Sequence, residues 1–247
     1  IVFGDWSSDV CSSDLVGNFA VPSPQVGGSP VQLVIASPCR AGESLVIQPL
    51  LTGNVTWDWA LSCFVAADHR TALGQLDTVF AAALLPPAGM VCIPWCTQAN
   101  PFLPGVRGGG LFAGLSVHAG TWDFVRAAAC GLCCEFHRVF AEVAEAGLVD
   151  CMVLGGGASQ GGFFQRLLAG LFAPLAVVTM ADADCAGARG ALAAFPGILT
   201  GGRFAPVEQP DGEAMDGLRG AAAAYRSCFE AVYGRHAAAA PYRLPAA

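Results

Sequence analysis

The sequence predicts an α/β domain, in which helices cover a sheet. An apolar run at 151–154 is typical of a buried strand, and it stops at three glycines, 155–157, where the backbone can turn tightly. From Phe163 to Leu171, apolar residues recur at the spacings of a buried helix face. Strand-like and helix-like stretches alternate through the rest of the second half, which favours a layered α/β architecture.

The first half of the chain predicts a hairpin, two helices and a short strand. Two apolar runs separated by Pro38 and Gly42 are typical of paired strands. The helices that follow carry aromatic and apolar residues, and Pro86 and Pro87 end the second of them. The predicted bounds are strands 32–37 and 45–50, helices 55–65 and 71–85, and strand 90–94. The Pro- and Gly-rich stretch 97–110 is too long for an idle connector, so we expect a functional loop there.

From residue 111 onward, strands and helices alternate. A short strand or turn at 111–115 leads to a long helix at about 121–146, with Asp123 favourably placed in its first turn. Ser159 is the expected N-cap of the helix after the glycines, and Asp182 or Asp184 caps a later one. The remaining elements are strand 175–180, helix 185–195, an exposed helix 215–234 and a frayed tail 237–247.

The N-terminus does not resemble natural protein. Residues 5–15, DWSSDVCSSDL, resemble the translated read-through of a sequencing-adapter oligonucleotide, with residues 1–4 as its flank. We therefore expect residues 1–15 to be a non-native segment that does not join the core. The natural reading frame then begins near Val16 without a start methionine, so we expect the chain to be a fragment. One large domain is expected at 16–236.

Composition argues against nucleic-acid and membrane partners. The formal net charge is −7, and three of the acidic residues lie in the 1–15 segment. The mild acidity that remains gives no electrostatic footprint for nucleic acid. An uncharged run at 78–106 is long enough to span a bilayer, but five prolines interrupt it. Loops between short buried strands explain this run better than a transmembrane helix.

Ten of the eleven cysteines lie outside the 1–15 segment. Two groups of residues have a spacing similar to that of metal ligands: Cys92 and Cys96, and then Cys130, Cys133, Cys134 and His137. The second group falls, however, inside the pattern of the long helix, where Cys133 and Cys134 are most simply small buried side chains. No secretory signal is visible, so we expect a cytoplasmic protein without structural disulfides, and we assign no metal site.

The strand, glycine turn and helix at 151–171 are suited to binding a nucleotide or phosphate. The free N–H groups at a helix N-terminus face the preceding turn, and glycines let a ligand lie directly against the backbone. A glycine turn after a strand is also common without any ligand, so this stretch alone leaves a plain turn open.

Four ordered motifs resemble the C-terminal domain of the FGGY carbohydrate kinases, over about residues 19–236. They are GLFAGL at 110–115, VRAA at 125–128, LGGGAS at 154–159 and AGARGAL at 186–192. The resemblance implies the actin-like, ribonuclease-H-like ATPase fold. It also implies transfer of the γ-phosphoryl group of ATP, with Mg²⁺, to a hydroxyl of a sugar or polyol. In that family the sugar binds mainly on the first domain and ATP mainly on the second.

The resemblance places nucleotide contacts at four glycines. Gly53 matches a family glycine near the ATP phosphates, and Gly156 and Gly157 match the pair along the adenosine. Gly161 stands where the glycerol kinases of the family carry an Asn against the adenine. The loop at 100–105 departs from the xylulokinase pattern, so neither xylulose nor glycerol is assigned as the substrate.

The family's catalytic Asp and its phosphate-holding Gly-Thr-Ser/Thr turn have no counterpart in this chain. Both are expected upstream of Val16, so no catalytic residue is assigned. The resemblance therefore implies an ATP-binding half that is inactive alone.

Two other classes of function stay open. A non-enzymatic actin-like protein would use the same nucleotide site, and the presence of a catalytic Asp upstream would distinguish a kinase from it. A small-molecule-binding α/β domain would use no nucleotide, which binding of an ATP analogue would test. The sequence leaves open the sugar, the phosphorylated hydroxyl and the oligomeric state, including a homodimer.

Overall fold

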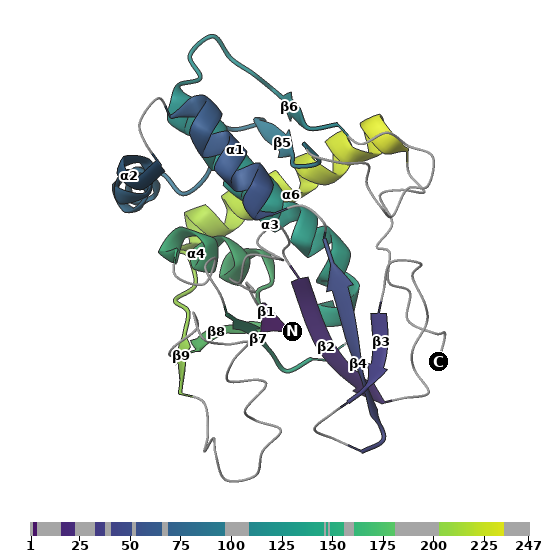
Figure 1. The fold of residues 1–247 in the computed structure, drawn as a ribbon. Helices are drawn as coiled ribbons and strands as arrows, with labels where there is room; N and C mark the ends of the chain where they lie inside the picture. The colour runs from purple at the N-terminus through teal and green to yellow at the C-terminus, as the bar shows by residue number, and fades with distance from the viewer. Residues whose placement is uncertain are drawn as a thin grey trace.

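The computed structural model describes residues 2–3, 16–22, 33–37, 41–50, 53–65, 69–96, 109–145, 147, 149–155, 161–180 and 203–234. Figure 1 shows most of its helices above a long sheet, and the last turns of α3 (Thr121–Glu145) running down behind β2 (Val16–Pro22) and β4 (Glu43–Pro49). The predicted α/β fold class is confirmed.

One seven-stranded sheet joins strands from both halves of the chain, in the order β3-β4-β2-β1-β7-β8-β9. β1, β7 and β8 run parallel to one another, and the other neighbouring pairs are antiparallel. The strands are β1 Val2–Phe3, β2 Val16–Pro22, β3 Leu33–Ala36, β4 Glu43–Pro49, β7 Cys151–Leu154, β8 Ala176–Met180 and β9 Phe204–Pro206. The carboxyl ends of β7 and β8 therefore lie together, at the edge where ligands of α/β sheets commonly bind.

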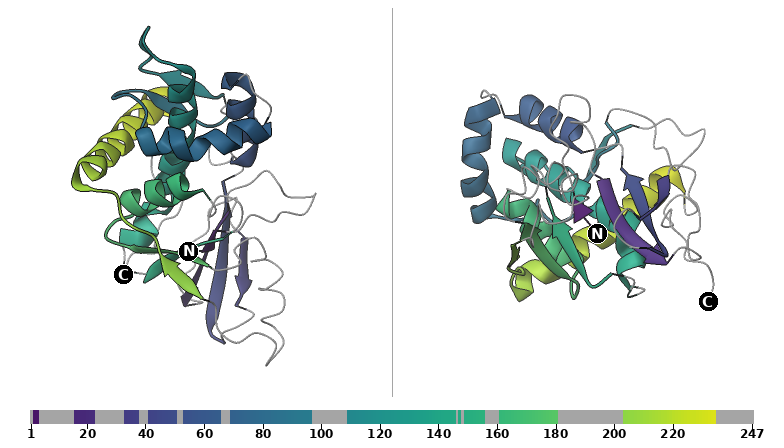
Figure 2. Two further views of the ribbon diagram at one scale, coloured as in Figure 1. Left: turned by 90° about the vertical axis from the view of Figure 1, so that its left-hand side faces the viewer. Right: turned by 60° about the horizontal axis from the view of Figure 1, so that its bottom comes forward.

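The long helix α3, Thr121–Glu145, is the centre of the core. Its apolar residues recur at helical spacing, and most of its side chains are buried. α1 (Asn54–Phe64) and α6 (Gly212–Tyr233) flank it on opposite sides, as the left-hand view of Figure 2 shows. α4 (Gly162–Leu171) packs against α3 and β8, and α2 (His69–Ala82) packs against α4.

A two-stranded sheet lies against α3. It pairs β5, Val91–Ile93, with β6, Leu111–Ala113, in antiparallel register. Gly131 of α3 approaches β5 so closely that a Cβ atom there would lie 2.2 Å from the carbonyl oxygen of Cys92. Glycine is therefore what lets the helix and strand backbones touch.

A buried polar network links α3 to α6. Arg138 donates to the Glu135 carboxylate twice, from Nε to Oε2 over 2.8 Å and from Nη2 to Oε1 over 2.7 Å. The Tyr225 hydroxyl of α6 donates to the same Oε2 over 2.7 Å, and the guanidinium lies 4.4 Å from the ring centre of Phe229. Glu135 is 0% exposed and Arg138 5%. Burial, and then the Glu135 charge, raise the pKa of Tyr225, so the phenol keeps its proton and donates.

Most of the predicted elements are confirmed, with bounds shifted by a few residues. The hairpin β3–β4, the helices α1, α2 and α3 and the strand β7 all lie where the sequence pattern places them. Leu218, Tyr225 and Phe229 form the buried face expected of α6, and Cys133 and Cys134 are buried in α3. β2 and β9 have no predicted counterpart, because β2 contains glycine, asparagine and proline and β9 is three exposed residues.

The first two described residues lie in the sheet. The backbone of Val2 and Phe3 forms β1, which pairs with both β2 and β7. The expectation that residues 1–15 do not join the core stays a prediction. Residues 4–15, the helix predicted at 185–195 and the tail at 237–247 lie outside the described residues, and the domain limits stay a prediction.

Candidate functional site

The first turn of α1 begins at a glycine that follows β4. Gly53 is the buried N-cap, its carbonyl oxygen accepts from the Trp57 N–H over 2.9 Å, and no side chain caps the helix. The Thr56 hydroxyl donates to the carbonyl oxygen of Pro94 over 2.9 Å, and this buried bond ties the turn to the end of β5. The first turn of α1 therefore has no side-chain cap on its N–H groups.

The first turn of α4 is built in the same way. β7 ends at Leu154, the buried Gly155 follows, and α4 begins after its N-cap Gly161. The Gly161 carbonyl oxygen accepts from the Gln165 N–H over 3.2 Å, and again no side chain caps the helix. The prediction of Ser159 as the N-cap is therefore wrong.

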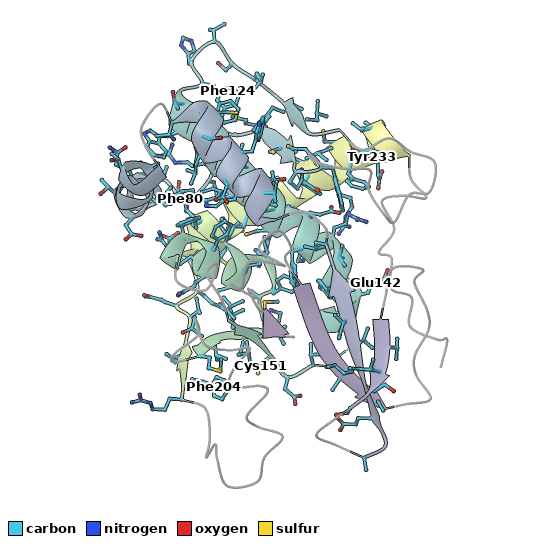
Figure 3. The ribbon with its side chains drawn as sticks, in the orientation of Figure 1. Phe80, Phe124, Glu142, Cys151, Phe204 and Tyr233 are labelled. Atoms are coloured by element: carbon cyan, nitrogen blue, oxygen red, sulfur yellow. The ribbon has the colours of Figure 1, made fainter. Side chains whose placement is uncertain are left out.

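The start of α4 coincides with its first buried aromatic residue. Phe163 stacks on Phe80 of α2, with ring centres 4.0 Å apart, and the helix begins one residue earlier. Figure 3 labels Phe80 between α2 and the body of the domain. Tertiary packing, and not a hydroxyl cap, accompanies the start of this helix.

Aromatic contacts bring the two helix N-termini together. The ring centre of Trp57, in the first turn of α1, lies 5.6 Å from that of Phe163 and 5.2 Å from that of Phe164, both in the first turn of α4. Each helix N-terminus carries a partial positive charge, so the two together favour an anion. The site therefore suits phosphate, and it lies near the carboxyl end of β7.

The structure describes two of the four glycines that the sequence predicts to bind the nucleotide. Gly53 and Gly161 are the N-caps of the two helices in contact. Gly156 and Gly157 lie outside the described residues. Gly161 has extended backbone, φ −82° and ψ 107°, which other residues adopt readily. A Cβ atom there would lie 3.1 Å from Cε1 of Phe163, so a side chain requires that ring to shift slightly.

The cysteines of α3 are buried thiols. Burial raises the pKa of Cys133 well above its usual value, and the hydrogen bond with Cys130, whose Sγ lies 3.9 Å away, raises that of Cys134. Thiols that hold their protons are poor metal ligands. Among the residues that the structure describes, no three His, Cys, Asp or Glu side chains gather as a metal site would require.

In the part of the chain that the structure describes, no helix combines enough length with enough apolar character to cross a bilayer.

The sequence from residue 46 to 195 matches the C-terminal domain of the FGGY family of carbohydrate kinases, which is more than half of the chain. This chain belongs to that family. Membership of this family explains why the four motifs occur in their order along the chain. It also confirms the actin-like ATPase fold class. No curated protein sequence matches the chain.

Solved FGGY-type kinases share the fold at low sequence identity. Xylulose kinase from Rhodospirillum rubrum matches with a TM-score of 0.67 and 16% identity, over 95% of this chain and 48% of its own. Gluconate kinase from Lactobacillus acidophilus matches with 0.62 and 17%, over 95% and 48%. Plasmodium falciparum glycerol kinase with ADP matches with 0.63 and 9%, over 94% and 46%. The chain thus spans about half the length of these kinases.

The contact between α1 and α4 was not predicted. Trp57 and Phe163 were each recognisable as buried helix residues, but nothing in their spacing pairs them. A glycine immediately before each aromatic first turn is the only local signal that the two helix starts share.

Proposed function

We propose that this chain forms the nucleotide-binding half of an ATP-dependent kinase that phosphorylates a hydroxyl of a sugar or polyol. The family assignment supports a carbohydrate kinase. The observation that carries the nucleotide role is the pair of glycine-capped helix N-termini, α1 and α4, held together by Trp57 and Phe163.

The residues present fit the phosphates of ATP. Gly53 begins α1 without a side-chain cap, and the macrodipole of that helix favours negative charge at its N-terminus. Gly161 is the N-cap of α4 and, by the resemblance, is proposed to lie on the adenine side of the nucleotide. Gly156 and Gly157, by their resemblance to the family pair, are proposed to lie along the adenosine. ATP would supply the phosphoryl group, and Mg²⁺ in such sites is commonly held by the phosphates themselves with one or two carboxylates.

We also propose that the 247 residues do not catalyse the transfer by themselves. The acceptor hydroxyl must be aligned and must lose its proton, and no residue here is assigned to either task. Those groups are proposed to lie in the half that the longer kinases possess. The names of the structural relatives include xylulose, gluconate and glycerol kinases, so the choice of substrate is left to experiment.

A charge reversal at Gly161 tests the nucleotide site. In Gly161→Asp the carboxylate caps α4 and adds negative charge beside a negatively charged nucleotide, whereas Gly161→Asn caps equally well without charge. We expect the Asp variant to weaken binding of a fluorescent ATP analogue about 2- to 30-fold, because charge at a helix N-terminus is worth ~0.3–2 kcal/mol. The Asn variant should bind at least as tightly as the parent chain.

Both variants add a Cβ atom against Phe163, so the comparison between them isolates charge from crowding. Circular dichroism checks that each remains folded. If both variants bind the ATP analogue equally weakly, the loss comes from crowding against Phe163 and not from charge. A parent chain that binds no analogue would contradict the proposed nucleotide role.

A further inference from the structure

A cavity of about 460 Å³ lies on the opposite side of the domain from the two helix N-termini. It is bounded by the last turns of α3, by the turn that follows α4 and by Asp150, directly before β7. β7 and β8 both begin here, since Cys151 pairs with Ala176, and Figure 3 labels Cys151 at that strand end. The volume is within the ~300–1,000 Å³ that small-molecule sites occupy.

The inner walls are apolar and include one aromatic ring. Ala141 and Ala144 of α3 have small side chains, and they leave space in front of Phe172 and Pro174. His137 meets Phe172 edge to face, with ring centres 5.0 Å apart. A flat or compact apolar group therefore has suitable surfaces to contact.

The mouth of the cavity carries negative charge. Glu145 and Asp150 line it and are exposed. The C-terminal ends of α3 and α4 also meet here, and neither helix has a basic residue in its last turn. Unpaired carbonyl groups at helix C-termini carry partial negative charge, so the mouth favours a cation. Among the described residues that line the cavity, none is arginine, and the chain contains no lysine.

His137 lines the cavity with a neutral imidazole. Burial, and then the charge of Arg226 on α6, lower its pKa to about 4, so the imidazole is neutral at pH 7. A neutral imidazole has one nitrogen that accepts a hydrogen bond. Arg226 is not among the residues that line the cavity.

We propose that this cavity binds a small organic amine, with an apolar or aromatic body against Phe172 and the alanines and its ammonium group facing Glu145 and Asp150. An anionic ligand would meet two carboxylates and two helix C-termini of the same sign. A metal ion would find too few ligands, since no three metal-binding side chains gather among the described residues. The site is separate from the proposed nucleotide site and does not depend on it.

The test is calorimetric titration of the whole chain with phenethylamine, in phosphate buffer at about pH 7 because Tris is itself an amine. Its uncharged counterpart, 2-phenylethanol, is titrated in parallel. We expect phenethylamine to bind up to about 25-fold more tightly, because two exposed carboxylate contacts are each worth up to about fivefold.

Substitutions at the cavity test where phenethylamine binds. Glu145→Gln should weaken phenethylamine binding about three- to fivefold. Glu142→Gln should leave it unchanged, because Glu142, labelled in Figure 3, is an exposed acid of the same helix that does not line the cavity. Ala141→Leu or Ala144→Leu should abolish binding by filling the space, and thermal unfolding shows which of them is folded.

Three results would overturn the proposal. They are no heat of binding with phenethylamine, equal binding of the amine and the alcohol, or equal weakening by Glu142→Gln and Glu145→Gln. Binding that survives a folded cavity-filling variant would also place the amine elsewhere.

Discussion

Given ATP, Mg²⁺ and a panel of ketoses and polyols, the 247-residue chain is expected to release ADP no faster than a blank without sugar. Loss of a catalytic base typically removes only ~10²–10⁴-fold of rate, which could leave a trace of activity. Loss of the acceptor site removes the positioning contribution as well, worth about 7–11 kcal/mol. The second loss is the larger and decides the expected result.

The measurement is coupled ADP release over the whole sugar panel. The matched control is the double variant Gly156→Asp, Gly157→Asp, which places two carboxylates in the proposed adenosine site. Sugar-dependent turnover that exceeds this control would show that the catalytic apparatus lies within these residues. An equal background in both proteins agrees with the prediction, and binding of the ATP analogue can still be measured independently.

Replacing Arg138 by methionine is expected to destabilise the fold by about 3–5 kcal/mol. Met has a similar length but no charge, so Glu135 would be left buried without its cation, and breaking a buried pair from one side typically costs this much. For a domain of this size the loss corresponds to a melting temperature lower by roughly 6–20 °C. Tyr225→Phe removes one hydrogen bond to the same carboxylate and should cost about 1–3 kcal/mol.

The chain offers a matched surface control for this prediction. Asp216 and Arg219 on α6 form an ion pair at the same spacing of three residues, but their side chains are 79% and 74% exposed. Arg219→Met should therefore change stability by at most ~1 kcal/mol. Urea unfolding of both variants gives the comparison, and equal losses would show that the buried network contributes little.

The sequence predicted those elements whose periodicity is long and uniform. α3 has 25 residues with an apolar stripe, and the strand before the glycines is a plain apolar run. β9 has only three exposed residues, too few for any period to emerge. The start of α4 was misplaced because Ser159 has the side chain of a cap, whereas the structure begins the helix beside Phe163.

The candidate site was predicted in part, for a different reason. The glycines are local signals, and two of them are described at helix starts. The ring contact between Trp57 and Phe163 joins segments far apart in the chain, and no local sequence pattern predicts it. The sequence analysis assigned no role to Glu135 and Arg138, and the packing of α6 over them makes them a buried pair.

The two-residue strand β1 has a consequence for the behaviour of trimmed protein in solution. Val2 and Phe3 are the only described residues that join the antiparallel strands β2, β3 and β4 to the parallel strands β7 and β8. Deleting residues 1–4, an obvious choice for a segment that resembles adapter read-through, would uncover backbone N–H and C=O groups on the facing edges of β2 and β7. Open strand edges pair with strands of other molecules. The trimmed chain is therefore expected to elute from a sizing column as larger and more heterogeneous species than the full chain.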